Sequence, residues 1–145
     1  MSREARAPRS KFVVWRRFTT RWADNDAYGH VNNTVFYQWF DSAVNSWLVD
    51  ERLLNIESGD LIALVAETRC TYAAPLAFPG EVEVGLSVAA LGRSSVHYRI
   101  GVFGDGEELA AAQGEFVHVL VDRTSRTPVE MPSDWRRALE AIRPD

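Results

Sequence analysis

The sequence predicts an α+β fold, in which one long buried helix is combined with a mostly antiparallel sheet. Residues 34–49 form an apolar segment of helical character, and several later segments alternate apolar and polar residues as half-buried strands do. The turn at residues 104–106, Gly-Asp-Gly, is a strong hairpin signal between two of these strands. With 145 residues, 46% of them hydrophobic, the chain can bury one core, and it has no internal repeat.

The first expected element is a strand over residues 12–22. Its alternating apolar side chains share one face: Phe12, Val14, Phe18 and Trp22. A helix follows over Thr34–Val49, and its apolar side chains cover far more than a narrow stripe: Val35, Phe36, Trp39, Phe40, Ala43, Val44, Trp47 and Leu48. A helix this apolar is expected to be wrapped by a sheet.

Four further strands and a short helix are expected in the second half of the chain. The strands cover residues 61–72, 81–90, 96–102 and 107–121, and each is bounded by glycine, proline or polar turn residues. The last helix starts at Met131-Pro132-Ser133 and runs through residue 142, with an apolar stripe of Trp135, Leu139 and Ile142.

Composition limits the domain organisation and the partners. We expect a flexible N-terminal tail over residues 1–10, which are basic and polar, and a single domain over residues 11–145. The one cysteine suits a reducing, cytoplasmic compartment. A net charge of −4 argues against nucleic acid as a partner, and the lack of 18 consecutive apolar residues argues against a membrane span.

Chemistry-bearing side chains concentrate in residues 24–33, Asp-Asn-Asp-Ala-Tyr-Gly-His-Val-Asn-Asn, just before the apolar helix. Asn32 or Asn33 is a good N-cap, so the first-turn N–H groups of the helix can stabilise a developing oxyanion. Gly29 allows another group to approach the backbone closely, and Asp26 and His30 lie near enough in sequence to serve one reacting centre. Turn and cap chemistry alone would also use Asp and Asn here.

This motif, followed by Thr-Val-Phe-Tyr-Gln-Trp-Phe-Asp, resembles the signature of hot-dog-fold acyl-CoA thioesterases of the 4-hydroxybenzoyl-CoA thioesterase family. In that family the second Asp of Asp-x-Asp is the catalytic carboxylate, which is Asp26 here, and the oxyanion donor is a backbone N–H near Asn33. The motif is also similar to that of plant acyl-ACP thioesterases, whose Asp, Asn and His fall on Asp26, Tyr28 and His30. The Asn of the plant motif is therefore replaced by Tyr28.

The resemblance implies a hot-dog fold, with an antiparallel five-stranded sheet wrapped around the central helix, and a homodimer or homotetramer whose sites lie between subunits. It implies a thioesterase for an acyl-CoA or related acyl thioester, with no cofactor and no metal. Asp26 and His30 would be catalytic, while Tyr28, Gly29 and Asn33 would contact the substrate. Arg93, in the turn after the third strand, matches a basic position near the nucleotide end of CoA.

The residues leave several alternatives open. Asp26 could act as a nucleophile or as a general base. A hot-dog hydratase or dehydratase, or a non-catalytic acyl-binding module, could share the pocket. Cys70 is expected to be a packing residue, and His97 and His118 lack a metal-ligand pattern around them. The sequence has no Gly-x-Ser-x-Gly elbow, which disfavours a serine hydrolase.

Overall fold

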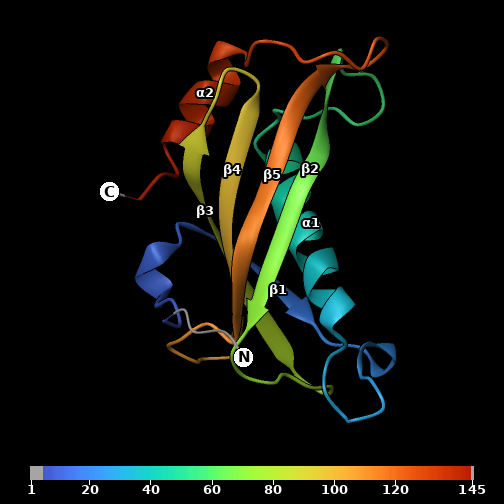
Figure 1. Cartoon of the computed structure of the whole chain (residues 1–145), viewed down its shortest axis with the longest axis vertical. Helices are drawn as coiled ribbons and strands as arrows, with labels where there is room; N and C mark the ends of the chain where they lie inside the picture. The colour runs from blue at the N-terminus through green and yellow to red at the C-terminus, as the bar shows by residue number, and fades with distance from the viewer. Residues whose placement is uncertain (1–4, 145) are drawn as a thin grey trace.

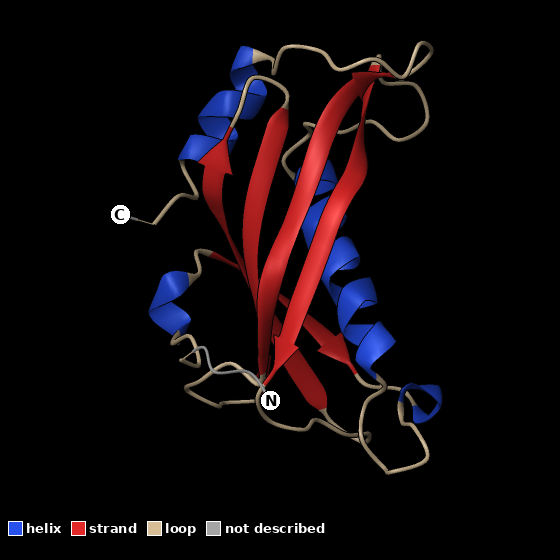
Figure 2. Cartoon of the chain, viewed as in Figure 1, coloured by secondary structure: helices blue, strands red, loops and turns tan. Residues whose placement is uncertain are grey.

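The computed structural model describes residues 5–144 as one antiparallel sheet packed against a long helix (Figure 1, Figure 2). The elements of this part of the chain are two 3₁₀ turns, Arg9–Lys11 and Trp22–Asp24, the strands β1 (Val14–Thr19), β2 (Leu61–Tyr72), β3 (Glu81–Leu91), β4 (Ser95–Gly104) and β5 (Ala112–Asp122), and the helices α1 (Asn33–Asp50) and α2 (Ser133–Glu140). The strand order is β1-β3-β4-β5-β2, with every neighbouring pair antiparallel. The expected hot-dog architecture is confirmed.

Helix α1 lies along one face of the sheet and supplies much of the core (Figure 1). All eight of the apolar side chains expected to be buried on this helix are buried, and α1 contacts strands β1, β2 and β3. Helix α2 lies at the end of the sheet where β3 turns into β4. Its Trp135 and Leu139, with Ile142 beyond its end, enter the same core. Burying such side chains contributes roughly 1.5–3 kcal/mol each.

The two edges of the sheet are β1 and β2. Strand β2 pairs with β5 along its length, with a register shift between Val65 and Glu67, and its middle residues are exposed. Two large apolar side chains, Leu64 and Val65, are among them. A long strand edge with exposed apolar residues is a surface that a second chain can cover.

All the expected strands except the one over residues 61–72 have different bounds in the structure, and the first and the fifth differ most. The first ends at Thr19, because Arg21 and Asp24 bond to each other and turn the chain into a 3₁₀ helix, and Trp22 is 83% exposed rather than inward-facing. The fifth begins at Ala112 rather than Glu107, because Leu109 and Ala110 pair with the N-terminal segment instead. The amide of Ala110 donates to the carbonyl of Ala7 at 2.9 Å.

Part of the expected N-terminal tail contacts the domain. Residues 1–4 lie outside the described residues, whereas the Ala7 amide donates to the Gln113 side chain at 2.7 Å and Arg9 forms an ion pair with Glu83 at 2.8 Å. The ring of Phe12 packs directly over Gly101 of the sheet, where a Cβ would lie 2.6 Å from the ring. Residues 5–12 are therefore attached to the outer face of the sheet, and the mobility of the tail stays a prediction.

None of the helices in residues 5–144 has the length and hydrophobicity needed to cross a lipid bilayer.

Candidate active site

The loop before α1 is a closed backbone turn. The amide of Asp26 donates to the carbonyl of His30 at 2.8 Å, and the amide of Gly29 donates back to the carbonyl of Asp26 at 3.1 Å. Gly29 has a φ of 82°, a left-handed conformation that glycine adopts without strain. The loop is therefore compact, and its backbone hydrogen bonds hold Asp26 and His30 next to each other.

This loop is also tied to the connection between β2 and β3. The Asn25 side chain accepts from the Phe78 amide at 2.9 Å and donates to the Phe78 carbonyl at 3.4 Å, while the Val31 amide donates to the Leu76 carbonyl at 2.7 Å. These hydrogen bonds hold the loop and the β2–β3 connection side by side at one end of the sheet.

The Asp26 carboxylate has one oxygen held by the loop and one oxygen available. Its Oδ1 accepts from the amide of Tyr28 at 2.8 Å and from the amide of His30 at 3.3 Å. Its Oδ2 has no hydrogen-bond partner among residues 5–144. The side chain is only partly buried, so the free oxygen can reach a ligand or a water molecule.

The neighbouring Asp24 has a different environment. It is 1% exposed, and its carboxylate accepts from the Arg21 amide at 2.7 Å and from the Arg21 guanidinium at 2.8 and 3.0 Å. Its backbone carbonyl accepts from the Asn32 amide at 2.8 Å. Asp24 therefore braces the loop against the start of α1 and is not available for chemistry.

The N-terminus of α1 leaves one N–H group free. Asn32 is the N-cap: its Oδ1 accepts from the Thr34 amide at 3.0 Å, and its carbonyl accepts from the Val35 amide at 3.0 Å. The Asn33 amide has no hydrogen-bond partner in the part of the chain that the structure describes. An unpaired N–H at the positive end of a helix is a donor for an oxygen that gains negative charge.

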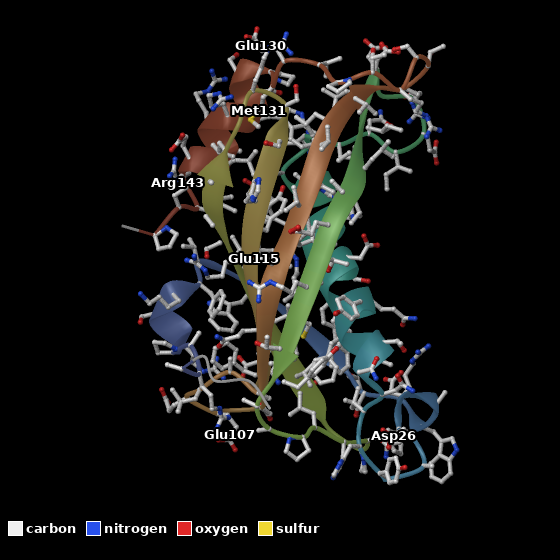
Figure 3. The ribbon with its side chains drawn as sticks, in the orientation of Figure 1. Asp26, Glu107, Glu115, Glu130, Met131 and Arg143 are labelled. Atoms are coloured by element: carbon white, nitrogen blue, oxygen red, sulfur yellow. The ribbon has the colours of Figure 1, made fainter. Side chains whose placement is uncertain are left out.

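Asp26 and Asn33 line the same cavity, of about 300 Å³. Figure 3 shows Asp26 at the lower end of the molecule. Its lining combines polar and apolar residues: Asp26, His30, Val31, Asn33, Phe36, Tyr72, Ala73, Ala74, Pro75 and Leu76. The polar groups come from the loop and the first residue of α1, and the apolar wall comes from α1 and the β2–β3 connection. This is the composition expected of a small-molecule site.

Three of the expected site residues line this cavity and three do not. Asp26, His30 and Asn33 do. Tyr28 is 87% exposed and lies outside the lining, as does Gly29, whose role is to shape the turn.

Arg93 lies at the other end of the sheet. Its carbonyl accepts from the amide of Met131 at 2.8 Å, and Figure 3 places Met131 at the end opposite Asp26. Within one chain, Arg93 and Asp26 therefore do not meet.

Sequence reasoning missed Tyr72, the last residue of β2. Its hydroxyl donates to the Asn33 carbonyl at 3.0 Å, and its ring meets Phe36 edge-on, with the ring centroids 5.1 Å apart. Because 39 positions separate Tyr72 from Asn33, no local spacing pattern could indicate that they are in contact.

Two other titratable side chains of the described residues, Cys70 and His118, have pKa values shifted by burial. Burial raises the pKa of the Cys70 thiol to about 11, which makes it a poor nucleophile and fits the expected packing role. Burial lowers the pKa of His118 to about 4. Within residues 5–144, no three His, Cys, Asp or Glu side chains are grouped so as to hold a metal ion.

A sheet wrapped around one helix, with a carboxylate and a free helix N–H on one cavity, defines a hot-dog domain of the thioesterase type. The chain belongs to the thioesterase-like superfamily, because the sequence model of that family matches residues 20–139. This confirms the family expected from the motif at the level of the superfamily. The finer assignment to the 4-hydroxybenzoyl-CoA branch stays a prediction.

Solved structures give the same fold. The PA5185 protein from Pseudomonas aeruginosa strain PAO1 is 45% identical, with a TM-score of 0.94 over 97% of this chain and 99% of that one. Slr0204, a 1,4-dihydroxy-2-naphthoyl-CoA thioesterase from Synechocystis, is 21% identical, with a TM-score of 0.79 over 88% and 96%. The DHNA-CoA thioesterase from Staphylococcus aureus is 19% identical, with a TM-score of 0.77 over 88% and 89%. A search of curated protein sequences gave no match.

Proposed function

We propose that this protein hydrolyses an acyl-CoA, or a related acyl thioester, to the free acid and the thiol. The observation that carries the proposal is that the free oxygen of Asp26 and the unpaired N–H of Asn33 belong to residues lining one cavity. Acyl transfer needs two groups: a nucleophile or base that acts at the carbonyl carbon, and a hydrogen-bond donor that stabilises the negative charge on the carbonyl oxygen. Membership of the thioesterase-like superfamily supports a hydrolase, and the acyl-CoA substrate is the finer part of the proposal.

In this mechanism the thioester oxygen accepts a hydrogen bond from the Asn33 amide. Asp26 then follows one of two routes. As a nucleophile, its carboxylate attacks the carbonyl carbon, the thiolate leaves, and water hydrolyses the resulting anhydride. As a general base, it takes a proton from a water molecule that attacks the carbonyl carbon, and the thiolate leaves from the tetrahedral intermediate. In the general-base route the proton on Asp26 passes to the departing thiolate. In the nucleophilic route the water that hydrolyses the anhydride supplies the proton that the thiolate takes up. Both routes therefore return Asp26 to its ionised form and release the acid and the thiol.

His30 has two roles in this proposal. Its backbone N–H holds Asp26 Oδ1, and its side chain lines the cavity, where it can orient the substrate or exchange a proton with the site. A thiolate is a good leaving group, so one carboxylate is sufficient and the mechanism requires no cofactor.

The assembly that we propose is a homodimer or homotetramer in which a second subunit completes the cavity. The exposed apolar residues of the β2 edge support an interface there. In this arrangement Tyr28 meets the substrate or the partner, and Arg93 can meet CoA phosphates only at a site completed by another subunit. The single cysteine is the basis for proposing a cytoplasmic location.

The test is a hydrolysis screen with the purified protein. Acyl-CoAs with short, long and aromatic acyl groups are incubated with it, and the free thiol is measured with a disulfide reagent. We expect thiol release from at least one acyl class. An enoyl-CoA in the same screen tests for hydration of the double bond. Hydration without thiol release would identify a hydratase instead, and tight acyl-CoA binding with no product would identify a binding module.

A further inference from the structure

The first peptide unit inside α1 is held from both sides by side chains. The peptide between Asn33 and Thr34 has its N–H bonded to the Asn32 side chain at 3.0 Å and its C=O bonded to the Tyr72 hydroxyl at 3.0 Å. The preceding peptide, which carries the free Asn33 N–H, is held through the bond from the Val35 amide to the Asn32 carbonyl. Three contacts therefore surround the Asn33 amide, which has no partner among the described residues.

Of these contacts, only the one from Tyr72 comes from outside the helix start. Asn32, Thr34 and Val35 are neighbours in sequence, whereas Tyr72 is the last residue of β2. Helix ends fray easily when they are held only by local bonds. The Tyr72 hydroxyl fastens this helix end to the sheet.

The position of the Tyr72 side chain is itself well defined. Its ring meets Phe36 edge-on and lines the cavity. Burial, followed by the neighbouring Cys70 thiol and Tyr37 hydroxyl, raises the pKa of Tyr72 well above its ordinary value. The hydroxyl therefore keeps its proton at neutral pH and remains a donor to the Asn33 carbonyl.

We infer that Tyr72 is a positioning residue for the reaction: its hydroxyl orients the first turn of α1 so that the Asn33 N–H points at the thioester oxygen. This inference rests on the proposed function and extends it to a residue in neither the motif nor the loop. Tyr72 acts through Asn33. Because the oxygen carries most charge in the transition state, misdirecting the N–H weakens transition-state binding more than substrate binding.

The experiment compares Tyr72→Phe with Tyr98→Phe. The first change keeps the ring against Phe36 and removes the hydroxyl that bonds to Asn33. The second is the matched control, because the hydroxyl of Tyr98 is buried and has no hydrogen-bond partner within the described residues. We expect Tyr72→Phe to lower kcat about tenfold while KM changes by less than about twofold, and Tyr98→Phe to leave both constants unchanged.

A spectroscopic readout separates positioning from a loss of folding. The ketone analogue of the best substrate, in which CH₂ replaces sulfur, is bound with a ¹³C-labelled carbonyl. We expect the carbonyl stretch to fall on binding to the wild-type protein and to Tyr98→Phe, and to move back towards its solution value in Tyr72→Phe. A change that only weakened folding would leave the stretch of the bound ketone unchanged.

The possible failures are distinguishable. Wild-type protein that hydrolyses no acyl thioester would overturn the proposed function and this inference with it. Active wild-type protein, together with a Tyr72→Phe variant of equal kcat and equal carbonyl stretch, would overturn this inference alone.

Discussion

Asp24 and Asp26 are separated by one residue and have opposite environments. Asp24 is buried and both of its carboxylate oxygens accept from Arg21, while Asp26 is partly exposed and one of its carboxylate oxygens has no partner among residues 5–144. The loop therefore separates a carboxylate that braces the fold from the carboxylate that we propose to be reactive. The two residues provide a matched pair for testing, because the same Asp→Asn change has a different expected result at each.

Asp24→Asn is expected to lower the stability of the fold. The amide NH₂ that replaces a carboxylate oxygen cannot accept from Arg21, so this buried NH₂ faces an N–H donor and lacks a partner, at a cost of about 1–3 kcal/mol. Urea unfolding followed by tryptophan fluorescence measures this loss. An Asp24→Asn variant as stable as the wild-type protein would contradict the bracing role.

Gly29→Ala is expected to strain the loop, and Gly29→Asn is its control. A Cβ at Gly29 meets no atom within 4 Å, so any effect comes from the φ of 82° alone. Alanine in this conformation costs about 1 kcal/mol, whereas asparagine tolerates it better. We expect alanine to lower both stability and kcat, since the turn also holds Asp26, and asparagine to retain most of both. Equal values for the two variants would show that the turn conformation does not matter.

Local sequence patterns predicted those helices and strands whose formation depends mainly on residues close together in the sequence. The helix expected over residues 34–49, observed at 33–50, and the strand at residues 61–72 were predicted because their periodicity and end signals are contained within each segment. The N-cap at Asn32 was one of two predicted choices, and the structure selects it through its bond to Thr34.

Contacts between distant segments were not predictable in this way. The alternation that reaches Trp22 continues past the end of β1, and only the Arg21–Asp24 pair shows why the strand stops. The N-terminal segment is held by Gln113, 106 positions away. Arg93 could not be placed far from Asp26 until the strands were known to run the length of the sheet.

Stability is expected to fall as the pH drops from about 6.5 to about 4, because of His118. Its pKa is about 4 in the folded protein and about 6.5 when unfolded, so the unfolded chain binds more protons in this window. The loss reaches about 2 kcal/mol by pH 5 and levels off below pH 4. Urea unfolding across this range measures it.

His118→Phe is the control for the pH effect, because it keeps an aromatic ring beside Phe116 and Tyr98 and removes the titrating group. The difference in unfolding free energy between the wild-type protein and this variant should depend on pH between 4 and 6.5. A constant difference would show that His118 does not cause the loss.

The assembly is expected to depend on the β2 edge. Val65→Glu places a charge on that edge and should shift the protein towards monomer in light scattering, with loss of activity. Val13→Glu is the matched control, since Val13 is 45% exposed against 48% for Val65 and lies outside β2. An active monomer, or equal effects of the two changes, would contradict a site shared across the β2 edge.

The most direct test of the central claim is the hydrolysis rate of Asp26→Asn beside that of the wild-type protein, with Asp24→Asn measured at a temperature where it is folded. Asp26→Asn keeps the size of the side chain and removes the basic, nucleophilic oxygen. We expect kcat for thiol release from the best acyl-CoA to fall on the order of 10²-fold or more with folding retained, while Asp24→Asn keeps most of its activity. Near-wild-type turnover by Asp26→Asn would contradict the assignment of Asp26 as the reactive carboxylate.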